Sequence, residues 1–313
     1  MAFRRGEVSE VTPESAQAWG QVCEPPAWGA TRPRRLWLHT LLFLATVLTT
    51  LAAGAFQFGV NLFAEPWRLY QGYPFAVSIL AILGSHEMSH FLTSRRRRLD
   101  VSLPYFLPGL PFPPPLPGTF GALIRIRSPI LDKRTLVEVG CSGPLMGILV
   151  AVPVLVVGLL LSPVKTLPAG AGEGIQLGEP LLFKFLCWLT LGPIGPNDHV
   201  IMHPVAFAGW LGMLITALNL LPVGQLDGGH VIYALFPSWH RRISIACLVM
   251  LVIFGILTWQ GWLLWATILA VMGFRHPPPY CDWIPLDRRH KALGVLTIVV
   301  FLLTFTPMPF NLG

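Results

Sequence analysis

Long apolar runs alternate with short polar segments over most of the chain. Most of the runs are close to the roughly 20 residues that a helix needs to cross a bilayer. They occupy residues 36–58, 72–93, 136–161, 203–223, 243–259, 261–274 and 292–308. The last two are short for a full crossing, so we interpret them as tilted or partly re-entrant. The pattern predicts an all-α polytopic membrane protein with about six to seven transmembrane helices.

Two neighbouring stretches break the helical pattern. Residues 104–117 are rich in proline and apolar residues, too interrupted for a helix and too apolar for a free loop, so we expect a re-entrant element packed within the protein. The sequence ALIRIR at 122–127 alternates apolar and basic residues with the period of a strand. We therefore predict a re-entrant loop and a short β-hairpin whose edge pairs with substrate. The alternative is an ordinary hairpin at the membrane interface.

The first 35 residues are polar, and the apolar pattern begins at Leu36. This stretch contains four glutamates, Glu7, Glu10, Glu14 and Glu24. Their presence argues against an organellar transit peptide, which is poor in acidic residues. We expect residues 1–35 to form a polar cytoplasmic tail and residues 36–313 to form one transmembrane domain.

Composition supports the membrane assignment, and charge gives an orientation. Hydrophobic residues make up 53% of the chain and charged residues only 12%, with a mean hydropathy of +0.62, whereas a soluble domain has about 25% charged residues. If the N-terminus is cytoplasmic, nineteen of the 22 lysines and arginines lie on the inner side, and only Arg68, Lys165 and Lys184 lie outside. The net charge of +7 is therefore explained by topology, and no nucleic-acid partner is expected.

The second apolar run contains the sequence HEMSH and no charged residue besides its glutamate. His86 and His90 stand four residues apart, so they share one helix face, where two imidazole nitrogens can bind one tetrahedral zinc ion. Glu87 lies between them and can accept a proton from a water whose pKa the metal lowers towards about 7. Because ionisable groups inside a spanning helix are costly and usually functional, the spacing predicts a metal site rather than a coincidence.

A zinc site needs a third protein ligand, and two acidic residues at the edges of other apolar runs are candidates. Glu138 follows Thr135 in the sequence TLVE, which is typical of a helix-capping box. Asp227 lies in NLLPVGQLDGGHVI, where proline and glycines interrupt a helix at membrane depth, and such a break requires a protein-lined or water-filled cavity. Asp227 can face the histidines from there, or it can simply cap the next helix. His230 can assist at the site, although a supporting or solvent-facing role is the simpler interpretation.

Four motifs together resemble the site-2 protease family of intramembrane zinc metalloproteases. In chain order they are HEMSH, GTFGALIRIRSP, GCSGPLMG and NLLPVGQLDGG, spread over nearly half of the chain. The stretch PYFLPGLPFPPPLPGTFGA is most similar to the plant plastid and bacterial branch. No PDZ or CBS module is recognised in the sequence, so regulation by such domains is not expected.

The resemblance implies a set of roles for residues in this chain. His86, His90 and Asp227 would bind one Zn²⁺ per chain, and Glu87 would be the catalytic base. Asn219 matches the asparagine of the family's NxxPxxxLDG pattern and would contact the substrate or the oxyanion.

We therefore expect a zinc endopeptidase that cuts a transmembrane segment of a membrane protein near the cytoplasmic face. Its partners would be that substrate and the lipid bilayer, and its location would be a bacterial or archaeal cell membrane. A metal or ion transporter and a non-catalytic membrane scaffold are the alternatives. Neither explains Glu87 beside the metal ligands. The sequence does not indicate the oligomeric state or the substrate.

Overall fold

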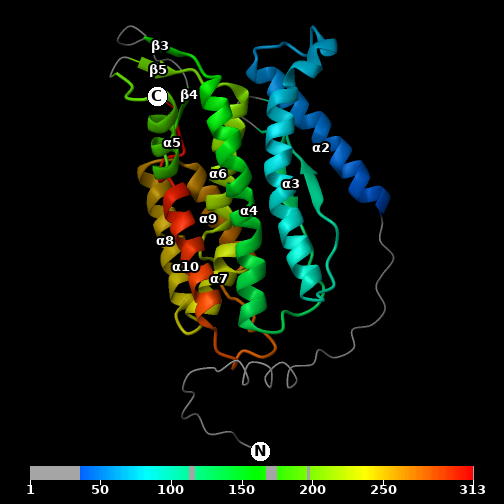
Figure 1. Ribbon diagram of the computed structural model, residues 1–313, viewed down its shortest axis with the longest axis vertical. Coiled ribbons are helices and arrows are strands. Elements are labelled where there is room, and N and C mark those ends of the chain that lie inside the picture. Colours follow the sequence, from blue (N-terminus) through cyan, green and yellow to red (C-terminus); the bar gives the residue numbers. More distant parts are fainter. Residues whose placement is uncertain (1–35, 113–116, 167–174, 196–197, 313) are drawn as a thin grey trace, which may run out of the picture.

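The computed structural model describes residues 36–112, 117–166, 175–195 and 198–312, so the predicted tail at 1–35 lies outside the described residues. The described chain is mainly helical (Figure 1). The helices are α2 (Leu36–Gln57), η1 (Pro66–Gly72), α3 (Tyr73–Arg96), α4 (Lys133–Leu160), α5 (Leu181–Leu191), α6 (Pro204–Asn219), α7 (Asp227–Leu235), α8 (His240–Leu257), α9 (Gly261–Met272) and α10 (Arg288–Thr304). The strands are β1 (Tyr105–Pro108), β2 (Thr119–Leu123), β3 (Val164–Thr166), β4 (Ile175–Leu177), β5 (Asp198–Val200) and β6 (Phe310–Leu312).

Four of the described helical segments are long and apolar enough to cross a membrane: α2, η1 with α3, α4 and α8. The helices α5, α6 and α9 are apolar but shorter, with 11, 16 and 12 residues. The predicted run at 203–223 is shorter as a helix because α6 ends at Asn219 and the chain turns before α7. The predicted polytopic helical architecture is confirmed.

The helices α3, α4 and α6 stand side by side at the centre of the molecule, and α2 leans against α3 (Figure 1). Their common core lies towards the end at which α3 begins and α4 ends. Phe75, Leu155 and Trp210 are almost completely buried there. A second apolar cluster forms around Leu251 and Trp262, where α8 and α9 pack as a pair.

The predicted hairpin exists, with a different boundary. Strands β1 and β2 pair antiparallel, from Tyr105 opposite Leu123 to Pro108 opposite Thr119. The predicted strand at 122–127 begins earlier than expected and ends at Leu123; Ile126 forms only an isolated bridge, with Val101. Helix α2 covers β1, and the rings of Phe43 and Phe106 meet edge to face.

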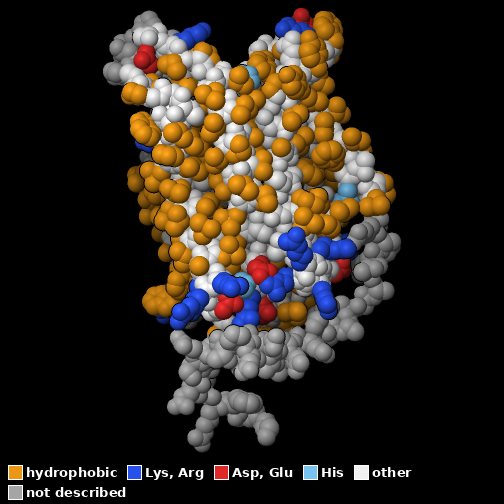
Figure 2. All heavy atoms as spheres, viewed as in Figure 1, with side chains coloured by type: hydrophobic (Ala, Val, Ile, Leu, Met, Phe, Trp, Pro, Cys, Tyr) orange, Lys and Arg blue, Asp and Glu red, His pale blue; other side chains and the backbone are white. Residues whose placement is uncertain are grey.

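The charged side chains are distributed unevenly between the two ends of the molecule. Lysines and arginines gather at the end where α3 finishes and α4 begins, below a broad apolar belt (Figure 2). We call this the basic end and the opposite one the far end. Lys165 in β3 and Lys184 in α5 lie at or towards the far end (Figure 1), and Arg68 in η1 precedes the far-end start of α3. The uneven distribution agrees with the charge bias of the sequence.

Candidate metal centre and catalytic site

The HEMSH sequence lies on α3, within about three turns of the helix end at Arg96. His86, Glu87 and His90 are only 4%, 7% and 6% exposed, although three ionisable groups would ordinarily stay in water. The helical spacing brings the two ring nitrogens together, with 3.1 Å between His86 Nε2 and His90 Nε2. The site therefore begins with two imidazoles on one face of one helix.

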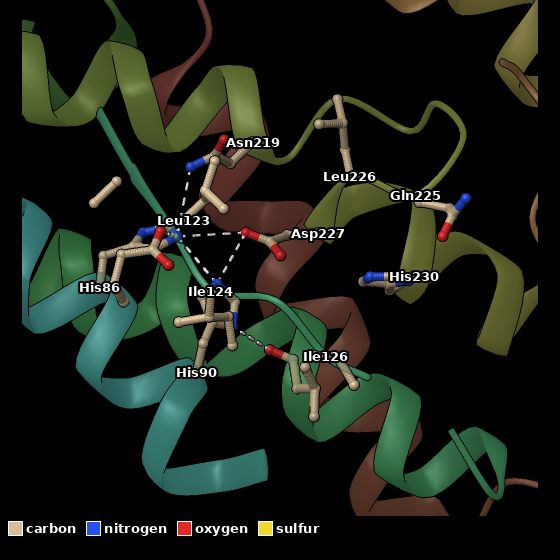
Figure 3. Close-up of a pocket in the computed structure, with 13 residues that line it drawn as sticks. His86, His90, Leu123, Ile124, Ile126, Asn219, Gln225, Leu226, Asp227 and His230 are labelled. Carbon is tan, nitrogen blue, oxygen red and sulfur yellow. Dashed lines mark hydrogen bonds and ion pairs between the residues drawn. The ribbon is translucent and has the colours of Figure 1, made fainter. Parts of the chain in front are cut away.

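Asp227 approaches these histidines from α7, of which it is the first residue. The chain turns sharply between α6 and α7, and a Cβ on Gly228 would lie 2.0 Å from the carbonyl oxygen of Leu220, so only glycine fits this turn. Asp227 Oδ2 lies 3.4 Å from His86 Nε2 and 3.2 Å from His90 Nε2 (Figure 3). The predicted third ligand thus lies beside both histidines, although it is 137 residues from His90 in the sequence.

The three donor atoms form a nearly equilateral triangle with sides of 3.1, 3.2 and 3.4 Å. Ligands held 2.0–2.1 Å from a tetrahedral zinc ion stand about 3.3 Å apart. Two imidazole nitrogens with one carboxylate oxygen are also ordinary zinc ligands, whereas magnesium and calcium prefer oxygen alone. Among the described residues, His86, His90 and Asp227 form a group whose ligand atoms lie close enough together to bind one metal ion. The residues fit zinc.

Helix α4 packs against the site through a row of glycines. A Cβ on Gly143 would lie 2.0 Å from His90 Nε2, and one on Gly147 would lie 3.0 Å from His86 Nδ1. A Cβ on Gly140 would lie 2.9 Å from the Asp227 carbonyl oxygen. The small residues of the GCSGPLMG sequence therefore allow α4 to pack closely against its neighbours, as small residues do in membrane helices. The neighbours here are His86, His90 and Asp227, which carry the donor atoms.

A main-chain group of α4 orients one of the histidines. His90 Nδ1 donates a hydrogen bond to the Val139 carbonyl oxygen, 2.8 Å away, and Ser142 Oγ lies 3.4 Å from the same nitrogen. The bond places the proton on Nδ1 and leaves Nε2 as the donor towards a metal. Metal-binding histidines ordinarily have such a partner on the second nitrogen. Sequence reasoning missed Val139 because a backbone carbonyl carries no residue signature.

Glu87 lies beside the triangle, with Oε1 4.0 Å from His86 Nε2. Its carboxylate accepts a hydrogen bond from the main-chain N–H of Ile124, the residue that follows β2. A pocket opens at this point, between α3, the end of β2, the end of α6 and the start of α7 (Figure 3).

Asn219 is the last residue of α6 and also lines the pocket. Its side-chain Nδ2 lies 3.4 Å from His86 Nε2, on the side of the triangle away from His90 (Figure 3). An amide N–H at this position can donate a hydrogen bond to an oxygen bound next to the histidines. The five residues to which the family resemblance gives roles thus line one pocket.

The interpretation of Glu138 as a helix cap is wrong. Asp132 caps α4 instead, since its Oδ1 accepts a hydrogen bond of 2.7 Å from the Thr135 N–H. Glu138 binds the Arg97 guanidinium with both oxygens and accepts from His290 Nε2 at 2.9 Å. It therefore ties the end of α3 to α4 and α10 at the basic end, one residue before Val139.

The chain thus combines apolar helices with a buried His-His-Asp donor set and an adjacent glutamate. This combination is typical of a membrane metallopeptidase. The family comparison agrees with this class. Residues 74–258, more than half of the chain, match the model of Peptidase family M50. The chain belongs to this family.

Similar proteins come from plants. "Probable zinc metalloprotease EGY1, chloroplastic" of Arabidopsis thaliana is 31% identical over 245 residues, which cover 75% of this chain and 43% of the relative. "Probable zinc metalloprotease EGY2, chloroplastic" of the same plant is 26% identical over 251 residues, covering 77% and 43%. "Probable zinc metalloprotease EGY3, chloroplastic" of Oryza sativa subsp. indica is 29% identical over 290 residues, covering 84% and 47%. The chain spans less than half the length of these relatives. No solved structure matches it significantly.

Proposed function

We propose that this chain is a zinc endopeptidase that hydrolyses a peptide bond within or near a transmembrane segment of another membrane protein. The observation that carries the proposal is the triangle of His86, His90 and Asp227 donors with Glu87 beside it, buried at one end of apolar helices. Membership of the peptidase family supports the chemistry. A transporter would not need a carboxylate held beside its metal ligands, and a scaffold would not need the glutamate.

The chain's own residues divide the work in a definite way. His86, His90 and Asp227 would hold one zinc ion, which when bound polarises a carbonyl group and lowers the pKa of a water. Glu87 takes a proton from the attacking water and passes it to the leaving nitrogen, and the Ile124 N–H keeps its carboxylate in place. The Asn219 amide donates to the oxygen on which negative charge develops.

The edge of β2 would receive the unwound substrate. A helical peptide has its carbonyls in hydrogen bonds, so a strand partner is needed once it unwinds. Ala122, Leu123 and Ile124 line the pocket. Donors alternate along a strand, so the Ala122 N–H points to the same edge as the Ile124 N–H that bonds Glu87. We propose Ala122 as the main-chain donor to substrate, because Ile124 already serves the catalytic carboxylate.

The proposal includes an orientation and a location. The basic end would face the cytoplasm with the N-terminal tail, residues 1–35, and the cleavage site would lie near that face; the support is the charge bias between the two ends. Residues 36–313 would form the protease domain in a bacterial or archaeal cell membrane. The names of the relatives raise a chloroplast membrane as the alternative. A membrane-spanning protein would be the substrate partner.

The decisive experiment separates chemistry from binding. Glu87→Gln keeps the shape and the three donors, so the purified variant should retain about one zinc per chain while cleavage falls by a factor on the order of at least 10². Fragments of single-span membrane proteins are compared by mass spectrometry between cells that express wild type and variant.

Glu179→Gln provides a matched control, because Glu179 is an exposed acid that pairs with Lys184 far from the site. This variant should produce the wild-type fragments. Identical fragment sets from wild type and Glu87→Gln would overturn the hydrolytic mechanism.

A further inference from the structure

A second group of histidines adjoins the catalytic pocket on the Asp227 side. His230 lies one turn after Asp227 on α7 and lines the pocket (Figure 3). Behind it stands His276, from the segment between α9 and α10, with His276 Nε2 2.7 Å from His230 Nδ1. The two rings are nearly perpendicular, with centroids 4.9 Å apart. The mechanism described above uses neither residue.

His276 is held on several sides. Its ring stacks on Tyr233 at 4.6 Å between centroids. The almost fully buried ring of His240 meets it edge to face, with the centroids 5.6 Å apart. Its Nδ1 lies 2.6 Å from the carbonyl oxygen of Pro277. Because neighbouring aromatic rings and a backbone carbonyl define the position, the imidazole of His276 has one orientation.

The hydrogen-bond partners determine where the protons lie. A carbonyl oxygen only accepts, so His276 Nδ1 must carry the proton that it donates to Pro277. Burial lowers the pKa of His276 to about 3, so the ring is neutral near pH 7 and its Nε2 has a lone pair. Two lone pairs cannot face each other at 2.7 Å, so His230 Nδ1 donates to His276 Nε2.

Burial also lowers the pKa of His230, to about 4, so its ring is neutral near pH 7 and its single N–H is on Nδ1. Its Nε2 is therefore a hydrogen-bond acceptor. In the described part of the chain His230 Nε2 makes no hydrogen bond of its own, and the residue borders the space that a substrate must enter. An unwound peptide brings main-chain N–H groups into this space, and a buried N–H without a partner costs about 1–3 kcal/mol.

We propose that His230 presents a neutral Nε2 acceptor to a main-chain N–H of the unwound substrate, and that His276 is the positioning residue that sets this tautomer. The inference deepens the proposed peptidase function and rests on it. His230 and β2 would then hold the extended peptide from two sides of the pocket, one by accepting hydrogen bonds and the other by donating them.

Two substitutions of His276 separate the acceptor from the ring. His276→Phe keeps the stacking on Tyr233 and removes the acceptor, whereas His276→Gln places an amide oxygen near the former Nε2. We expect His276→Phe to lower kcat/KM about tenfold, mainly through a higher KM, since one hydrogen bond in substrate binding is lost. His276→Gln should stay within about threefold of wild type. Cleavage is measured on a reconstituted single-span substrate found by the Glu87→Gln comparison.

A double-mutant cycle tests whether His276 acts through His230. In a His230→Phe background, His276→Phe should cause no further loss, because the acceptor that it positions is gone. Zinc content should remain at the wild-type level in each variant. Equal loss in His276→Phe and His276→Gln, additive losses in the cycle, or a second zinc per chain that disappears with His276 would each overturn the proposal.

A spectroscopic measurement tests the tautomer without any substrate. In zinc-loaded protein labelled with ¹⁵N-histidine, the His230 signals, assigned by their loss in His230→Phe, should show a protonated Nδ1 and an unprotonated Nε2. His276→Phe should mix the two tautomers. A wild-type His230 with the proton on Nε2 overturns the inference, even if the protein cleaves. Absence of cleavage with the expected tautomer would instead contradict the peptidase function.

Discussion

The same three helices, α3, α4 and α6, pack in two different ways at the two ends of the molecule. Towards the far end they meet through large apolar side chains, and the rings of Phe75 and Phe207 stack at 5.9 Å. Towards the basic end, α4 presents glycines to histidines of α3, and polar bonds replace aromatic packing. Lipid tails are as apolar as leucine, so helices in a membrane associate by shape and hydrogen bonding. We infer that the far end stabilises the fold and that the basic end carries the chemistry.

The strongest test of this division uses one glycine from each end. Gly143→Ala brings a Cβ to 2.0 Å from His90 Nε2, so the ring must leave the donor triangle. We expect zinc loss and a fall in cleavage by about 10² or more, with little change in the unfolding temperature of zinc-free protein. Zinc content, cleavage and thermal unfolding in detergent are measured on the same preparation.

Gly209→Ala is the matched control at the far end, where the added Cβ would lie 2.7 Å from the Cα of Leu155. It should destabilise the protein by about 1–3 kcal/mol and leave zinc content per folded molecule unchanged. If Gly209→Ala loses zinc and Gly143→Ala keeps it, the division between the two ends is wrong.

A cavity created by substitution at the far end should lower the stability and leave zinc binding unchanged. Phe75 has no exposed surface, and Phe75→Ala removes its ring from the core formed with Phe207. We expect a loss of about 3–5 kcal/mol in the free energy of unfolding, with zinc content preserved in the folded fraction. The measurement is chemical unfolding in mixed detergent, with Phe185→Ala as the control, since Phe185 is 53% exposed. A fall in zinc per folded molecule would show that the two ends are coupled.

The smallest effect is expected from the ion pairs at the basic end. Glu138→Gln weakens the contacts with Arg97 and His290, which are partly exposed, so we expect a loss of about 1 kcal/mol. Thermal unfolding provides the measurement. Glu179→Gln, which breaks an exposed pair with Lys184, should produce no measurable shift. Equal shifts in the two variants would mean that the network around Glu138 has no special role in joining the helices.

Much of the architecture was predictable because it depends on local pattern. The apolar runs predicted the long helices, and the proline and glycines after Asn219 predicted the break before α7. Errors arose where a partner distant in sequence determined the structure. Glu138, for example, pairs with Arg97 and His290 instead of capping α4.

The sequence by itself determined that His86 and His90 share a helix face and that Glu87 lies between them, because a helix relates residues four apart whatever surrounds it. Only the tertiary structure decided which carboxylate completes the triangle. Asp227 meets His90 across 137 residues, and Val139 orients His90 across 49. Such contacts depend on how closely α4 and α7 approach α3. Glycines make that close approach possible. In the sequence, a glycine indicates that another group packs closely against the helix, but it does not indicate which side chain that is.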